Sequence, residues 1–193
     1  MMKRVLFVLG VLEDDDIDWL LTVGQRLEFH AGDVLIRQQQ QAEAIYLLLD
    51  GTLHVSVASW PDQIIAELSS GEVVGEMSFV DTRPPSATVT AATPALLLAI
   101  PWSPLQSMLQ QDSRFAARFY RALAILLSSR LRTTVQHLEG EHWQPVVLSD
   151  QECSRDMAET ISLGGIRFDW LMRRLRDNPT APTEADWPTS EPE

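Results

Sequence analysis

The feature that most constrains the fold is a succession of short β-rich runs between residues 26 and 101 of this 193-residue chain. Turn-forming residues separate the runs, for example Ala-Gly-Asp at 31–33, Asp-Gly at 50–51 and Ser-Gly at 70–71. Many short strands at this spacing are typical of an all-β sandwich or roll. The predicted strands cover residues 26–30, 34–37, 45–49, 52–60, 63–68, 87–92 and 96–100.

Helical patterns precede the β-rich part. Residues 5–12 are apolar and follow a basic start, but Gly10, the acidic run at 13–16 and the lack of a small-residue cleavage site argue against a secretory signal. A short helix packed on the domain is expected there instead. Residues 13–23 should form a second helix, because carboxylates in a first turn are favoured by the helix dipole and Gly24 is a natural stop. No run of the sequence is long enough to span a bilayer.

Helical patterns also follow the β-rich part. Ser103 and Pro104 suit a helix start, with serine as the cap and proline at the first helical position. A long helix is expected from about residue 112 to 138, and a last amphipathic helix over 166–176, after a loose joint at 163–165. The long helix carries an apolar stripe, which either packs on the β-roll or forms the seam of a homodimer. The stripe consists of Phe115, Phe119, Leu123, Leu127, Leu131 and Val135.

The most informative segment is residues 71–89. It resembles the phosphate-binding cassette of cyclic-nucleotide-binding domains, such as those of catabolite activator protein and of protein kinase A regulatory subunits. Gly75 and Glu76 match the Gly-Glu pair of that family, and Ser-Ala-Thr-Val at 86–89 matches its final strand. The segments 31–36 and 45–53 resemble the opening strand and the central hairpin of the roll. The likeness covers roughly residues 12–138.

The resemblance implies a mainly β fold with flanking helices. The expected core is an eight-stranded, jelly-roll-like β-roll with an N-terminal helix and a long C-terminal helix. The predicted segments are 1–25 (N-terminal helical segment), 26–138 (β-roll and long helix), 139–177 (helical C-terminal extension) and 178–193 (disordered acidic tail).

The resemblance also implies a ligand, cyclic AMP or cyclic GMP, and a set of residues that bind it. Glu76 would accept the hydrogen bond of the ribose hydroxyl, Ser86 would bind a phosphate oxygen, and glycine would let the backbone approach closely. The implied ligand-binding residues are Gly75, Glu76, Met77, Ser78, Arg83, Pro85, Ser86, Ala87 and Thr88. Thr133 and Thr134 are candidates for contact with the base, although they can equally be plain helix surface.

Two positions depart from the family pattern. Pro85 stands where the family has the arginine that binds the phosphate. Arg83 can substitute for it, or can be a turn residue that pairs with Asp81. Loss of one charge-assisted hydrogen bond of about 1.5–3 kcal/mol implies reduced affinity. Gln39 stands near the place where the family has a glycine with positive φ, so the turn is either strained or different.

Composition narrows the function further. The formal net charge of −12 disfavours nucleic acid as a partner, and the single cysteine excludes an internal disulfide and fits a cytoplasmic location. The acidic residues and histidines at 137–142 match no common metal motif, and no catalytic or cofactor motif is found.

The sequence therefore predicts a non-enzymatic regulatory module for signal transduction that senses a cyclic nucleotide or a similar small anion, without cofactor, metal or membrane. The alternative is a ligand-free module that keeps the fold as a scaffold and docks a protein through its C-terminal extension.

Overall fold

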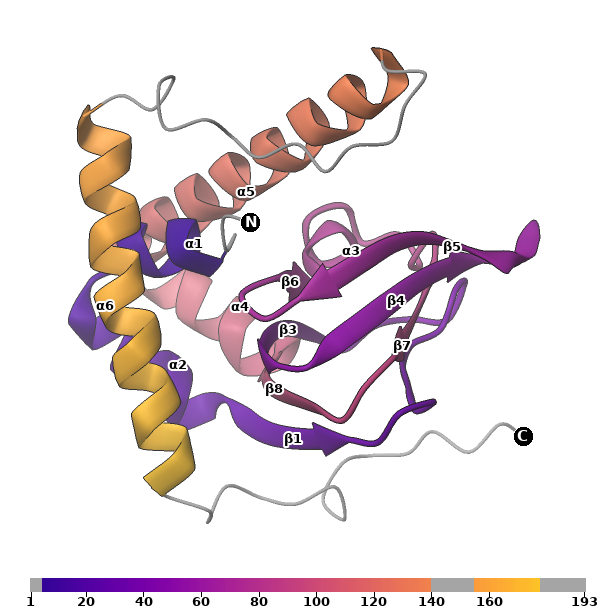
Figure 1. Cartoon of the computed structure of the whole chain (residues 1–193). Helices are drawn as coiled ribbons and strands as arrows, with labels where there is room; N and C mark the ends of the chain where they lie inside the picture. Colours follow the sequence, from indigo (N-terminus) through magenta and orange to yellow (C-terminus); the bar gives the residue numbers. More distant parts are fainter. Residues whose placement is uncertain (1–4, 140–154, 178–193) are drawn as a thin grey trace.

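Two four-stranded antiparallel sheets form a β-roll, and helices cover one side of it (Figure 1). The computed structural model describes residues 5–139 and 155–177, so the predicted tail at 178–193 lies outside the described residues. The strand orders are β1-β8-β3-β6 and β2-β7-β4-β5. The strands are β1 (Gln25–Phe29), β2 (Val34–Ile36), β3 (Ala44–Asp50), β4 (Thr52–Val57), β5 (Trp60–Ser69), β6 (Val73–Val74), β7 (Thr88–Ala91) and β8 (Ala95–Pro101). The eight strands with flanking helices confirm the predicted fold class.

Strand β3 shows why the sequence of the first sheet is so apolar. It pairs with β8 on one side and β6 on the other, so it is central in its sheet. Ile45, Leu47 and Leu49 face the helices, whereas Tyr46 and Leu48 face the interior of the roll. Successive strand residues point to opposite faces, so burial on both faces requires a continuous apolar run instead of an alternating one.

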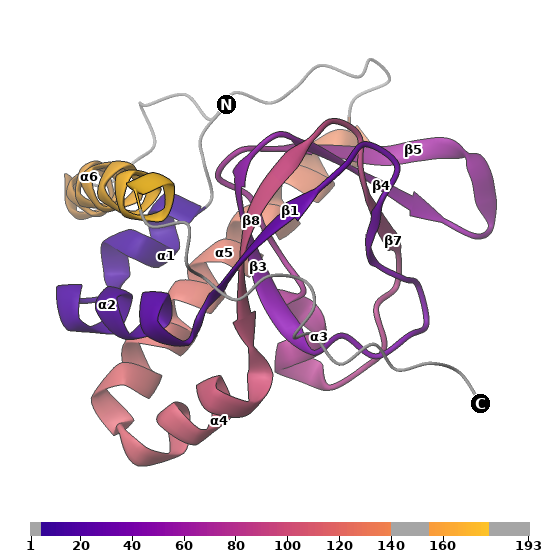
Figure 2. The ribbon, with the colours of Figure 1, turned by 90° about the horizontal axis from the view of Figure 1, so that it is seen from below.

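The helices pack against the outer face of the β1-β8-β3-β6 sheet, as Figure 2 shows. They are α1 (Val5–Val11), α2 (Asp14–Val23), α3 (Glu76–Asp81), α4 (Trp102–Gln111), α5 (Ser113–Glu139) and α6 (Arg155–Asp177). The two expected N-terminal helices and the long helix are confirmed within one or two residues. Among the described residues, no helix combines the length and the apolar character needed to cross a bilayer.

Two predictions about helix ends were wrong. The helix predicted to have Ser103 as its cap begins two residues earlier, with Pro101 at its N-cap, because β8 runs straight into it and the Trp102 N–H donates to the Glu43 carbonyl. The expected joint at 163–165 is the middle of the continuous helix α6. Both errors come from local signals that were overruled by packing between distant segments.

Asp112 begins α5 as an N-cap. Its carboxylate accepts hydrogen bonds from the Arg114 N–H at 2.8 Å and the Phe115 N–H at 3.0 Å. These backbone donors, that of Phe115 first, lower the pKa of Asp112 below its ordinary value.

The apolar stripe of α5 divides into two parts. Phe115, Phe119 and Leu123 are buried in the core beneath the helices, so this half packs on the protein's own fold. Leu131 and Val135, further along the helix, are exposed. Tyr120, next to the buried Phe119, is exposed as well. The first half therefore follows the packing alternative, and the exposed residues leave the dimer seam as a prediction.

Candidate functional site

The predicted cassette starts at a tight turn between β6 and α3. Gly75 has φ +87° and ψ −7° and is the N-cap of α3. A Cβ at this position would lie 2.6 Å from the Ala44 carbonyl oxygen on β3. A side chain is therefore excluded both by the left-handed backbone and by the neighbouring strand. The close approach expected at Gly75 is present, and strand β3 is what approaches.

Two buried carboxylates and one arginine form the centre of the cassette. Glu72 and Glu76 are 2% and 1% exposed. The Arg130 guanidinium, from α5, donates to Glu76 Oε1 and to the Val73 carbonyl oxygen, and Arg130 Nη2 lies 3.7 Å from Glu72 Oε2. The formal charge of this cluster is −1, because it contains two carboxylates and one guanidinium. The long helix is thus tied directly to the carboxylate that the resemblance assigns to the ribose hydroxyl.

The turn after α3 points its arginine away from this cluster. Arg83 is 84% exposed at its side chain, its Nε lies 3.9 Å from Asp81 Oδ2, and its N–H donates to Asp81 Oδ1. The geometry follows the alternative in which Arg83 is a turn residue paired with Asp81. Pro85 is buried, and its carbonyl accepts a hydrogen bond of 2.9 Å from the Gln39 N–H. Gln39 has φ +64°, which confirms the positive φ expected there.

The other predicted residues are spread around the cassette. Ser78 is buried, and its carbonyl accepts the N–H of Thr82, whereas Met77 is exposed on the outer side of α3. Ser86 is exposed and Ala87 is half-buried. The hydroxyl oxygen of Thr88 accepts the Gln38 N–H at 3.1 Å. The structure thus brings Gly75, Glu76 and Ser78 to the buried side of the cassette and leaves Met77, Arg83 and Ser86 at its surface.

The two predicted base contacts lie on α5 beyond Arg130. Thr134 is exposed, and its hydroxyl donates to the Arg130 carbonyl at 3.0 Å. Residues four apart share one helix face, so Thr134 stands one turn above the arginine that enters the cassette. The side chain of Thr133 lies outside the described part of the protein.

Arg130 is the site residue that sequence reasoning missed. Ala122 and Leu126 are buried on α5, and Arg130 continues their spacing of four. A charged residue on the buried face of an amphipathic helix needs a partner, because a buried unpaired charge is costly. This interruption of the buried face was the available signal, but the partner Glu76 is 54 residues away in the sequence.

Tyr46 lies next to the cassette inside the roll. It pairs with Val74 of β6 and belongs to the apolar cluster between the two sheets. Burial, and to a lesser degree the charge of Glu43, raises the pKa of Tyr46 to about 12. The phenol therefore stays neutral at physiological pH.

A separate groove of about 440 Å³ lies beside β4 and shares Thr88 with the predicted site. Val55 and Val89 point into the roll, so the adjacent Ser56 and Thr88 point away from it. The groove is lined by Arg37, Gln38, Gln40, Ser56, Val57, Ala58 and Thr88. It does not include Glu76 or Arg130.

Comparison with known proteins gives the same family as the cassette residues. Residues 26–112 match the sequence profile of the cyclic nucleotide-binding domain. The chain is 29% identical over 113 residues to lysophospholipase nte1 of Aspergillus fumigatus, which covers 57% of this chain but only 7% of that protein. It thus spans a small part of this curated relative.

Solved structures show the same fold. A cyclic nucleotide-binding domain from Methylobacillus flagellatus superposes with a TM-score of 0.65 at 19% identity, covering 76% of this chain and 86% of that one. The catabolite activator protein of Thermus thermophilus gives 0.58 at 20% identity, covering 89% and 87%. The resemblance found in the sequence is confirmed: residues 26–112 match the family model of the cyclic nucleotide-binding domain, and the chain has the fold of the solved domains.

Proposed function

We propose that this domain is a regulatory module that binds a cyclic nucleotide, or a small anion of similar chemistry, at the cassette with low affinity. The observation that carries the proposal is the cluster of Arg130 with Glu76, Glu72 and the Val73 carbonyl. It connects the carboxylate suited to a ribose hydroxyl with the long helix, so an event at the cassette can move α5.

Glu76 retains capacity for a ligand. A carboxylate has two oxygens with about four acceptor positions, and Arg130 donates to Oε1. Oε2 is the atom that we assign to the ribose hydroxyl. Because Glu76 is almost fully buried, the cassette must open before the hydroxyl can reach it. The apparent affinity is then reduced by the fraction of molecules that are open.

Charge gives a second reason for low affinity. The phosphate of a cyclic nucleotide carries one negative charge, and the formal charge of the cluster is also negative. Pro85 supplies neither a side-chain donor nor a backbone N–H. Arg83 is exposed and paired with Asp81. Losing one charged hydrogen bond of about 1.5–3 kcal/mol weakens binding by roughly 10- to 150-fold.

Thr134 is proposed as the contact to the base. It shares a helix face with Arg130 and is exposed on the side of α5 that continues past the cassette. Thr133 stays a prediction without further support. A hydroxyl here can donate to or accept from a purine edge.

A second copy is the proposed partner of α5. Tyr120, Leu131 and Val135 are exposed on a helix whose other face is already packed. Leu131 and Val135 are four residues apart, and Tyr120 lies eleven residues, about three turns, before Leu131, so the three share one helix face that suits the seam of a helix pair. The proposal places the protein in the cytoplasm, as its single cysteine favours.

The alternative function is a ligand-free interaction module. It is favoured by the same Arg130 ion pairs, because they satisfy Glu76 without any ligand. In that case the cluster is structural, and partners bind the helical surfaces.

Calorimetric titration with cyclic AMP and cyclic GMP separates the two functions. The ligand-binding proposal expects a dissociation constant of about micromolar or weaker, and a further loss in Glu76→Gln, which removes the carboxylate acceptor. Glu67→Gln, on the exposed side of β5, is the control and should bind as the parent does. Equal binding by the parent and Glu76→Gln would refute the assignment of the site.

A further inference from the structure

Helices α1 and α6 cross so closely that their backbones touch. A Cβ on Gly164 of α6 would overlap the carbonyl oxygen of Leu6, and a Cβ on Gly10 of α1 would overlap that of Thr160. Two glycines that face each other's helix fix both the distance and the register of the crossing. Figure 1 shows α6 beside α1 at one side of the molecule, opposite the side to which the β4–β5 hairpin extends.

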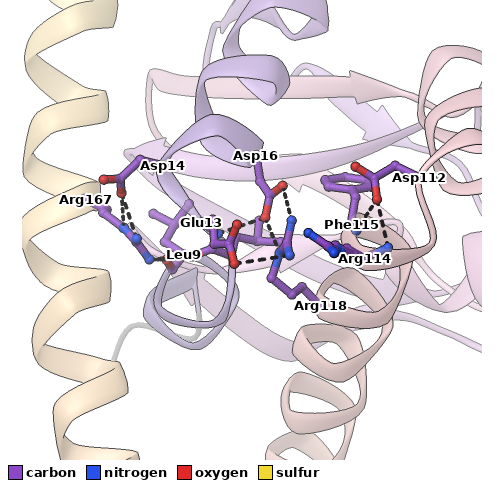
Figure 3. A network of polar contacts seen from close by, with 10 residues as sticks. Leu9, Glu13, Asp14, Asp16, Asp112, Arg114, Phe115, Arg118 and Arg167 are labelled. Carbon is purple, nitrogen blue, oxygen red and sulfur yellow. Dashed lines mark hydrogen bonds and ion pairs between the residues drawn. The ribbon is translucent and has the colours of Figure 1, made fainter.

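Arg167 joins α6 to the end of α1 and the start of α2. Its Nη1 donates to the carbonyl oxygens of Leu9, at 2.8 Å, and Leu12. Its Nε and Nη2 lie 2.9 and 2.7 Å from Asp14 Oδ1 (Figure 3). The last carbonyls of a helix have no partner inside it, so α6 supplies donors that α1 itself lacks.

The other end of α1 touches the cassette. The Val5 N–H donates to the Gly71 carbonyl at 2.7 Å, directly before Glu72. One apolar cluster contains Phe168 of α6 together with Val73 and Phe79 of the cassette. α6 is therefore connected to the cassette in two ways, through helix α1 and through the apolar cluster that both share.

The same N-terminal helices hold the helix that carries Arg130. Arg118 of α5 makes two hydrogen bonds, of 2.6 and 2.8 Å, with the buried Asp16 of α2, and it lies 3.2 Å from Glu13 (Figure 3). The hydrogen bond to Asp16 raises the pKa of Arg118. α1 and α2 are thus fastened to α6 on one side and to α5 on the other.

We propose that α6 is a strap whose docking on α1 holds the cassette closed, so that release of α6 and opening of the cassette are coupled. The closed form is the one described here, in which Glu76 is buried against Arg130 while α6 is docked. Coupling between two sites is reciprocal: whatever opens the cassette must loosen α6 to the same extent. The part of the test that uses a ligand rests on the proposed function, and the part that uses hydrogen exchange does not.

Gly164→Ala and Gly165→Ala form a matched pair for the test. They make the same change at neighbouring positions of one helix, but a Cβ at Gly164 overlaps α1, whereas nothing lies within 4 Å of a Cβ at Gly165. In amide hydrogen exchange of the full chain, Gly164→Ala should accelerate exchange across α6. It should also accelerate exchange of residues 71–79, by at least about fivefold, the lower end of typical couplings between sites. Gly165→Ala should exchange like the parent, and residues 53–57 of β4 serve as the internal reference.

Arg167→Gln is the second perturbation, because it removes the donors to α1 without adding a side chain to the crossing. Faster exchange in α6 with unchanged exchange at 71–79, in either variant, would overturn the coupling. If neither variant alters exchange in α6, the claim that these contacts dock α6 is wrong. Accelerated exchange of the whole protein, including β4, would show general destabilisation and would also count against a specific strap.

Titration with cyclic AMP then shows whether docking of α6 weakens or strengthens ligand binding. A strap that restrains opening predicts that Gly164→Ala binds at least about fivefold tighter than Gly165→Ala. Equal or weaker binding would refute the restraining role. If the parent and both variants fail to bind, the proposed ligand is wrong, whereas the hydrogen-exchange result still decides the coupling between α6 and the cassette.

Discussion

Gly75 offers the sharpest test of the cassette geometry, because the protein contains a matched control. Gly75 and Gly32 both have positive φ, +87° and +96°. A Cβ on Gly75 would lie 2.6 Å from the Ala44 carbonyl, whereas nothing lies within 4 Å of a Cβ on Gly32. Alanine in place of Gly32 is therefore destabilising only because of the positive φ. Alanine in place of Gly75 is destabilising because of the positive φ and because its Cβ overlaps strand β3.

The expected magnitudes follow from these two terms. A left-handed conformation costs an ordinary residue roughly 1–2 kcal/mol. Forcing an extra carbon into a packed site costs about 1–3 kcal/mol more. Gly32→Ala should lower the free energy of unfolding by about 1–2 kcal/mol and Gly75→Ala by about 2–5 kcal/mol. Gly75→Val should be worse, since β-branched side chains tolerate positive φ poorly.

Urea unfolding followed by circular dichroism measures the difference. The two alanine variants are compared at equal m-value, so that the shift in midpoint reports stability. Equal losses in the two variants would refute the claim that β3 packs against Gly75. In that case the cassette turn would not be held in the position described here.

Two further predictions concern helix α5. Asp112→Asn should be less stable than the parent at neutral pH, and this difference in the free energy of unfolding should shrink as the pH falls below 3.8. The reason is that a carboxylate with a lowered folded-state pKa stabilises the protein only while it is ionised. A difference independent of pH in acid-unfolding curves would argue against this role of the cap. Leu131→Glu should convert a dimer to monomers in sedimentation velocity, because Leu131 is 65% exposed on the proposed seam. The exposed Arg132→Glu is its control, and a parent that is monomeric at high micromolar concentration would dismiss the seam.

The β-roll could be predicted because its signals are local. The glycines at the turns around residues 32, 51 and 71 and the apolar runs of β3 and β8 fix strand positions within a few residues. Strand β6 was not predicted, since two residues are too few to show any periodicity. Gln39 shows that a family pattern can predict a backbone angle even where the residue type departs from it.

The chemistry of the site could be predicted only in part, because its partners are far apart in sequence. The residue types at Gly75 and Glu76 pointed to the cassette, but the ion pair of Glu76 with Arg130 joins segments that no local pattern connects. The predicted joint at 163–165 was wrong for the same reason. A glycine such as Gly164 indicates a helix break unless the neighbouring helix that it contacts is known.

Titration of the parent and of Pro85→Arg with cyclic AMP tests the central claim most directly. In the proposed site, Glu76 is kept as the ribose acceptor and the phosphate-binding arginine is missing at Pro85. We expect a dissociation constant of about micromolar or weaker for the parent and binding tighter by roughly tenfold or more in Pro85→Arg. Because Pro85 is buried, thermal melting must first show that the variant is folded. Nanomolar binding by the parent, or no binding by a folded Pro85→Arg, would refute this description of the site.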